Sequence, residues 1–310
     1  MSRSAEEAPR PGVVRYLVFP DQAGRRLDQG AAELSGLPRR RVRALADDGR
    51  LWLNGKVVRV VSRQLRTADV VDILGGDDAL ASPRSLPTAL AVIHEDGWLV
   101  AIDKPPGLAS QPPRQRAAGE LTAQEHLALQ IAARDGRRFE PLLIHRLDRL
   151  TTGVLLFARQ HDASRALART WAEGRVDKRY LAVVCGDPGE ALRVVDGPIG
   201  PDSAAPGRYR VNRDGRPART DVKRLAASGG YALVEVHPLT GRTHQVRVHL
   251  AHAGFPVAGD PLYGGGGRVP RPFLHASTLA LPHLKGRKRL RLDAPMPPDM
   301  AAFLASHNLV

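Results

Sequence analysis

Cysteine is almost absent from the sequence: Cys185 is the only one in 310 residues. A single cysteine excludes an intramolecular disulfide and a cysteine-rich zinc site, and it fits a reducing compartment. No run of about 18 apolar residues is present, so we expect no membrane span. The N-terminal residues MSRSAEEAPRPG lack the apolar stretch and cleavage site of a secretory signal. Together these absences predict a cytoplasmic protein.

Several common enzyme motifs are also missing. No Gly-x-Gly-x-x-Gly follows a predicted strand, and there is neither a Walker loop nor a Gly-x-Ser-x-Gly elbow. Nucleotide-cofactor enzymes and serine hydrolases therefore lose their main sequence support. We expect no nucleotide or redox cofactor.

Acidic residues are the minority charge, with 32 Asp and Glu against 46 Lys and Arg, for a net charge of +14. A basic surface attracts polyanions such as RNA. The alternative is a high-GC genome, in which arginine is simply common. At 43% hydrophobic residues the chain can bury one large core or two smaller ones.

The N-terminal part of the chain predicts a small domain. Arg26–Leu34 and Pro38–Ala46 are expected to form short helices, with Pro38 suited to a first helical turn. Asn54-Gly55 between two apolar segments predicts a β-hairpin, and residues 69–74 a closing strand. We divide the chain into a disordered tail (1–14), a small domain (15–75), a Gly- and Pro-rich linker (76–88) and a larger domain (89–310).

The larger domain is expected to mix strands and helices without regular βαβ repeats, which favours the α+β class. Expected helices are Ala123–Ala133 and Ala163–Trp171, and expected strands are Leu90–His94, Trp98–Ile102, Val154–Ala158, Tyr180–Val184 and Tyr231–Val236.

One segment, His145-Arg146-Leu147-Asp148-Arg149-Leu150-Thr151-Thr152-Gly153, stands directly before a buried strand. It places a carboxylate, Asp148, between two arginines. Nearby cations favour an ionised carboxylate, which can act as a nucleophile. The alternative is an ion pair that only fixes a loop.

A second dense segment runs from Pro238 to Gly254. Thr243 is expected to N-cap a short helix that ends near Gly254. Arg242 and Arg247 are expected to bind phosphate or carboxylate groups. The three histidines of this segment invite a metal site, but no cysteine or clustered carboxylate completes a ligand set, so we expect no metal.

Two shorter segments are ambiguous by themselves. Asp103-Lys104-Pro105-Pro106-Gly107 predicts a rigid turn that carries one cation, Lys104. Tyr180, in Lys178-Arg179-Tyr180, opens a strand, where a lone tyrosine is usually part of the core or the sheet surface.

Taken in order, these segments resemble the RluA-type family of pseudouridine synthases, over roughly Leu90 to His283. The resemblance implies that Asp148 is the catalytic aspartate, that Tyr180 contacts the target base, and that Arg242 pairs with Asp148. Arg146, Lys104 and Arg247 would then bind substrate. The segment departs from the family pattern at Thr152, where serine is usual, and at Ala109-Ser110-Gln111.

The N-terminal segment from Arg26 to Lys56 resembles the RNA-binding module of ribosomal protein S4. RNA-binding residues would be Arg39, Arg40, Arg41, Arg43 and Lys56. Residues 15–75 hold twelve Lys or Arg against seven Asp or Glu. A solvated helix face is the alternative explanation for this cluster.

The resemblance implies a mixed, mainly antiparallel catalytic sheet of the pseudouridine synthase type, preceded by a small α/β-hairpin RNA-binding domain. It implies an enzyme that isomerises uridine in RNA, most often large-subunit ribosomal RNA, although tRNA stays open. A monomer without cofactor, metal or membrane partner is expected. The alternatives are a non-catalytic RNA-binding or ribosome-assembly protein, a glycosidase, which needs two carboxylates, and a metal nuclease.

Overall fold

The computed structural model describes residues 12–75, 79–113, 117, 119–266, 269–285 and 288–309. The chain forms two compact units that alternate along the sequence. The first comprises residues 1–90 and 111–142, and the second residues 91–110 and 143–310. Most of the expected tail, and residues 76–78 of the expected linker, lie outside the described residues. No helix in the described ranges is both long and apolar enough to cross a membrane.

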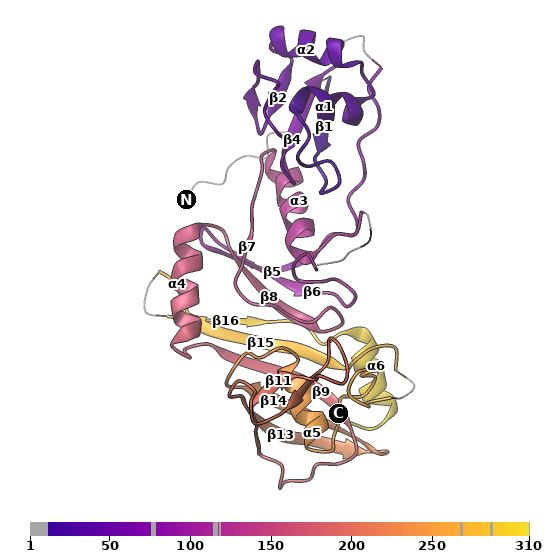
Figure 1. Cartoon of the computed structure of the whole chain (residues 1–310), viewed down its shortest axis with the longest axis vertical. Helices are drawn as coiled ribbons and strands as arrows, with labels where there is room; N and C mark the ends of the chain where they lie inside the picture. The colour runs from indigo at the N-terminus through magenta and orange to yellow at the C-terminus, as the bar shows by residue number, and fades with distance from the viewer. Residues whose placement is uncertain are drawn as a thin grey trace. The chain divides into compact units, whose positions relative to one another are not determined.

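The first unit contains a four-stranded antiparallel sheet in the order β1-β4-β2-β3 with two short helices (Figure 1). The predicted helices and hairpin are present. Asn54 and Gly55 both have positive φ, 54° and 76°, as a type I′ turn requires. The elements are β1 (Val13–Leu17), α1 (Leu27–Ser35), α2 (Arg39–Asp47), β2 (Leu51–Leu53), β3 (Lys56–Val57) and β4 (Val70–Leu74).

Aliphatic side chains of α1 and α2 form the core of this unit against the sheet. Leu27 and Ala31 of α1, and Val42 and Leu45 of α2, have no exposed surface, as expected for helices with one apolar face. Full burial of each larger side chain contributes about 1.5–3 kcal/mol.

Helix α3 (Ala123–Asp135) also belongs to the first unit, although the sequence places it in the larger domain. Thr122 and Glu125 form a capping box at its N-terminus. Leu129 packs with Phe19 and Val70 in a second buried cluster. The first unit therefore contains a segment from between the lysine turn and the Asp148 motif, because the apolar face of α3 covers side chains beside β1 and β4.

The second unit is built on a large sheet in the order β10-β13-β14-β9-β15-β8-β6-β5, with β16 paired to β15 and β7 to β8. Along this order the neighbouring strands are antiparallel except for β15 and β8, which run parallel, and β16 is antiparallel to β15. The expected α+β class with a mainly antiparallel sheet is confirmed. The strands are β5 (Ala91–Glu95), β6 (Leu99–Lys104), β7 (Leu142–Leu143), β8 (Thr152–Ala158), β9 (Asp177–Cys185), β10 (Val194–Asp196), β13 (Arg219–Ser228), β14 (Tyr231–Pro238), β15 (Leu274–Pro282) and β16 (Arg289–Asp293).

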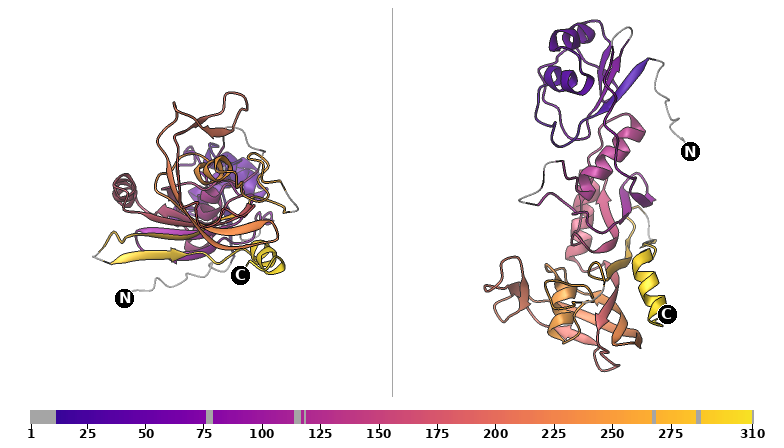
Figure 2. Two further views of the ribbon diagram at one scale, coloured as in Figure 1. Left: turned by 90° about the horizontal axis from the view of Figure 1, so that it is seen from below. Right: turned by 90° about the vertical axis from the view of Figure 1, so that its right-hand side faces the viewer.

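Helices cover both faces of this sheet (Figure 2). Neighbouring residues of a strand point to opposite faces: Val184 packs with α5 (Gln245–His252), whereas Val183 packs with α6 (Pro298–Ser306). The unit is completed by α4 (His161–Ala172) and a small two-stranded sheet of β11 (Ile199–Pro201) and β12 (Tyr209–Val211). The α5 face of the sheet carries the Pro238–Gly254 segment, so this is where its polar residues meet the Asp148 loop.

Candidate active site

The loop that carries Asp148 lies between β7 and β8, and it is fixed by side chains from the end of β6 and from the segment that follows β6. The Ser110 hydroxyl donates to the Leu147 carbonyl (2.8 Å) and accepts from the Leu147 N–H (3.0 Å). The Lys104 ammonium donates to the Arg149 carbonyl at 3.0 Å. The backbone is thus held on both sides of Asp148.

Lys104, for which the resemblance implies a substrate contact, donates to backbone carbonyls in this structure. Its side chain is fully buried and also donates to the carbonyls of Pro105 and Leu108, both at 2.9 Å. Burial lowers the pKa of Lys104 to about 7, with partial opposition from Asp148. The sequence could not distinguish a buried cation that binds carbonyls from one that faces a ligand. Lys104 is a positioning residue for the loop.

Immediately after the loop, β8 approaches β15 very closely. Gly153 has a φ of 110°, and a Cβ at this position would lie 2.2 Å from the Ala276 carbonyl oxygen, so no other residue fits without a backbone shift. The buried Thr152 hydroxyl hydrogen-bonds His275 Nδ1 at 2.9 Å. The Thr152 hydroxyl therefore links β8 to β15.

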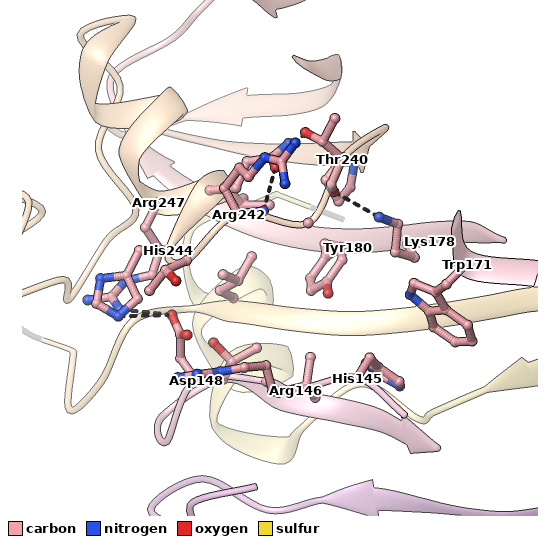
Figure 3. A pocket seen from close by; sticks show the side chains of 18 of the residues that line it. His145, Arg146, Asp148, Trp171, Lys178, Tyr180, Thr240, Arg242, His244 and Arg247 are labelled. Carbon is pink, nitrogen blue, oxygen red and sulfur yellow. Dashed lines mark hydrogen bonds and ion pairs between the residues drawn. The ribbon is translucent and has the colours of Figure 1, made fainter. Parts of the chain in front are cut away.

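Asp148 pairs with Arg247, not with Arg242. Nη1 of Arg247 donates to Asp148 Oδ2 at 2.9 Å, as Figure 3 shows. Arg242 instead donates through Nε to the Pro217 carbonyl at 2.9 Å. The prediction that Arg242 pairs with Asp148 was wrong, because Arg247 projects from the first turn of α5 toward the loop whereas Arg242 precedes the helix.

Arg247 is itself held by a second carboxylate that sequence reasoning missed. Asp260 has no exposed surface and accepts two hydrogen bonds from Arg247, at 2.7 and 2.8 Å. Burial alone would lower the pKa of Arg247, but Asp260 and then Asp148 raise it above its usual range. The Tyr263 ring lies under the guanidinium, 5.1 Å from its centroid. This bidentate geometry leaves Arg247 charged and fixed.

Helix α5 begins one residue later than expected. His244 rather than Thr243 is its N-cap, and the His244 backbone is left-handed, with φ 56°. The His244 Nδ1 hydrogen-bonds the Tyr263 hydroxyl at 2.8 Å, and Nε2 lies 3.9 Å from Asp148 Oδ2. On the sequence His244 stood out only as a possible metal ligand, and its spacing did not indicate that it faces Asp148.

A cavity of about 290 Å³ opens beside Asp148. In Figure 3, Asp148, His244 and Arg247 lie at one end, Trp171 at the other, and Tyr180 between them. The structure thus brings Asp148, Tyr180, Arg242, Arg146 and Arg247 together around one cavity, and leaves Lys104 out.

The far end of the cavity is formed by residues that were not proposed as site residues. His145 stacks on Trp171, with 5.3 Å between ring centroids and 19° between planes. Burial lowers the pKa of His145 to about 4, so this ring is neutral. Lys178 donates to the Thr240 carbonyl at 2.8 Å, and burial lowers its pKa to about 8. A flat aromatic wall and a cation therefore lie opposite Asp148.

The described residues contain no group of three or more His, Cys, Asp or Glu that could hold a metal ion. His249 is fully buried and bonds the Thr220 hydroxyl (2.8 Å) and the Gly197 carbonyl (2.9 Å). Its two ring nitrogens thus serve the packing of α5 on the sheet.

Comparison with known proteins identifies the class. A family model described as RNA pseudouridylate synthase matches residues 98–252. An RNA pseudouridine synthase of Chloroflexus aurantiacus is 36% identical over 299 residues, 93% of this chain and 92% of the relative. The ribosomal large subunit pseudouridine synthase D of Nitrosomonas europaea is 35% identical, over 94% of this chain and 88% of the relative.

The solved structure of human RNA pseudouridylate synthase domain containing 4 has the same fold, with a TM-score of 0.57 and 28% identity over 69% of this chain and 92% of the human one. Fold and sequence together define an isomerase that acts on uridine in RNA. The chain belongs to the RNA pseudouridine synthase family, in its RluA-type branch.

We predict that Asp260→Asn lowers kcat for pseudouridine formation by tenfold or more, with little change in KM. A tenfold loss is about what one hydrogen bond to a charged group contributes. Loss of the carboxylate charge frees Arg247 to move away from Asp148. Breaking a buried pair also lowers the free energy of unfolding, by about 3–5 kcal/mol. Steady-state kinetics and urea denaturation measure the two effects.

Asp299→Asn is the matched control, because Asp299 also accepts two bonds from a buried arginine, Arg271, at 2.7 Å each. This control should lose stability and retain kcat. An equal loss of kcat in both variants would show that Asp260 acts only through folding.

Proposed function

We propose that Asp148 is the catalytic carboxylate with which this enzyme converts uridine to pseudouridine. One observation carries the proposal: among the described residues that line the cavity, Asp148 is the only carboxylate, and a fixed guanidinium lies 2.9 Å from it. A glycosidase would normally place two carboxylates across the scissile bond. A single carboxylate favours a reaction in which the base is detached and rejoined in the same site.

Isomerisation breaks the N1–C1′ bond and forms a C5–C1′ bond. The target base must leave its stack to enter the cavity. Once there, a carboxylate can act as nucleophile or charge stabiliser at the sugar or the ring. Attack at C1′, attack at C6 and abstraction of a sugar proton are all compatible with the position of Asp148.

Tyr180 is proposed to hold the detached base. Its ring lies between the two ends of the cavity in Figure 3, where it offers a stacking surface. Burial and the nearby Asp148 charge raise the pKa of Tyr180 above its usual range, so the phenol stays protonated and can donate. Arg146 and Arg242 also line the cavity and are proposed to contact RNA phosphates.

Large-subunit ribosomal RNA is the proposed substrate. The proposal is supported by the name of the Nitrosomonas relative, a ribosomal large subunit pseudouridine synthase, which matches 94% of this chain. It is further supported by the basic first unit, whose residues 15–75 we propose to be an S4-like RNA-binding module.

In the proposed module, Asp28 organises the arginine cluster of α2. Asp28 is fully buried and accepts bonds from Arg39 (2.9 Å) and Arg43 (2.6 Å), and also from Arg26. Burial alone would raise the pKa of Asp28, but these bonds lower it below its usual range. Since Arg39 and Arg43 each keep about half of their side chain exposed, they can bind a phosphate as well.

The side chains of Arg40 and Lys56 are exposed and have no hydrogen bond or ion pair to another described residue, so they are the simplest ones with which to test phosphate contact. Arg41 is the remaining proposed contact of this cluster. Deleting the module is a poor test, because α3 packs against it. Point substitutions avoid this disruption.

We predict that Asp148→Asn lowers pseudouridine formation by at least about 1,000-fold, because the reactive carboxylate is lost with little change in shape. RNA affinity should stay near wild type. The assay is tritium release or nucleoside analysis on large-subunit rRNA and tRNA transcripts. Asp214→Asn, at an exposed loop position, is the control and should be fully active. An Asp148→Asn enzyme with wild-type turnover would rule out this catalyst.

We predict that Arg40→Ala and Lys56→Ala each weaken RNA binding and flatten its salt dependence. Removing one phosphate partner should change the log–log salt slope by about 0.7–0.9. Single-turnover rates at saturating RNA should change much less. Arg84→Ala is the control, since Arg84 lies outside the proposed module and its guanidinium covers the Phe19 ring. Unchanged affinity and slope in both variants would mean that these two residues do not hold RNA.

A further inference from the structure

His244 has a left-handed backbone, which is uncommon for residues other than glycine. Four described residues other than glycine have positive φ, and His244 is the one that lines the cavity. Such outliers persist where the surroundings determine them and are frequent at functional sites. The left-handed backbone turns the His244 side chain toward Asp148 just before α5 begins.

Hydrogen bonds to Tyr263 determine which nitrogen of His244 carries the proton. The Tyr263 hydroxyl accepts from the Tyr209 N–H at 3.0 Å and contacts His244 Nδ1 at 2.8 Å. Its own proton has no other acceptor among the described residues, so it is donated to Nδ1. In a neutral imidazole the other nitrogen then carries the proton. Burial lowers the pKa of His244, with Asp148 in partial opposition, which favours the neutral form.

The resulting Nε2–H donor has no partner in the described protein. It lies 3.9 Å from Asp148 Oδ2, which is too far for a hydrogen bond, and Oδ2 already accepts from Arg247. The rings of Tyr209 and Tyr263 contact the imidazole edge-to-face, with centroids 5.7 and 5.8 Å away. His244 is therefore a fixed, neutral donor that faces the cavity beside the carboxylate.

Building on the proposed role of Asp148, we propose that His244 recognises the target base by donating its Nε2–H to a carbonyl oxygen of uracil. A base placed for reaction with Asp148 must lie within reach of this donor. Uracil offers carbonyl oxygens O2 and O4, whereas cytosine carries an amino group, itself a donor, in place of O4. A contact to O4 would thus select uridine over cytidine, and a contact to O2 would orient the ring.

The test is a double-substitution cycle between His244 and single atoms of the target nucleotide. Wild-type and His244→Asn enzymes are assayed on RNAs that carry uridine, 2-thiouridine, 4-thiouridine or 2′-deoxyuridine at the target position. Asparagine tolerates the left-handed backbone. With uridine, His244→Asn should lower kcat/KM by about tenfold, as expected for one hydrogen bond.

One of the two thio substitutions should cause a similar loss in the wild-type enzyme and almost no further loss in His244→Asn. Tyr263→Phe keeps the ring under Arg247 but removes the hydroxyl that orients His244. Tyr263→Phe should lower kcat/KM for uridine less than His244→Asn does. Like His244→Asn, it should lose little further activity with that thio substitution. Circular dichroism melting of both variants establishes that they are folded under assay conditions.

Two results would overturn the assignment. If, for both thio substitutions, the loss of kcat/KM in His244→Asn equals the product of the separate losses, His244 acts only through the backbone or folding. Coupling to 2′-deoxyuridine alone would make the partner a sugar hydroxyl. These results differ from failure of the proposed function, in which wild-type enzyme forms no pseudouridine or Asp148→Asn remains active.

Discussion

The candidate active site depends on one buried guanidinium. Arg247 joins Asp260, which has no exposed surface, to Asp148 in the cavity. A buried charge is tolerated only when it is paired and hydrogen-bonded, and here the guanidinium donates three bonds to two carboxylates. Asp260 binds Nε and Nη2 of Arg247 and so fixes the guanidinium, which leaves Nη1 to bind Asp148. The position of the proposed nucleophile is thus set from the α5 side of the sheet.

The Asp148 loop is fixed from its other side by side chains that hydrogen-bond its backbone. Lys104 and Ser110 bind the backbone next to Asp148, while Gly153 lets β8 approach β15 directly after the loop. Segments far apart in sequence therefore converge on one carboxylate. Such rigidity suits a reaction in which a detached base must be rejoined at a different atom, since a misplacement of about 1 Å can cost a hundredfold in rate.

Sequence reasoning predicted the class, the sheet type and some of the residues that line the cavity, because four short segments occur in the family's order. It failed where a choice depended on geometry. Arg242 and Arg247 are equivalent as residue types, and only the start of α5 at Gln245 decides which one faces Asp148. Asp260 was not proposed, since an acidic residue in a loop carries no sign of burial. The packing of α3 in the first unit is likewise a tertiary contact, and the spacing of apolar residues in a sequence does not predict which partner a helix packs against.

The most direct measurement of the central claim is chemical rescue of Arg247→Ala by guanidinium, with Arg242→Ala as the comparison. Arg247→Ala should lose most of its pseudouridine formation and recover part of it in low-millimolar guanidinium, which can occupy the space between Asp260 and Asp148. Arg242→Ala should retain catalysis at saturating RNA and show no rescue. Wild-type turnover by Arg247→Ala, or rescue of Arg242→Ala instead, would contradict the role of Arg247 as the group that positions Asp148.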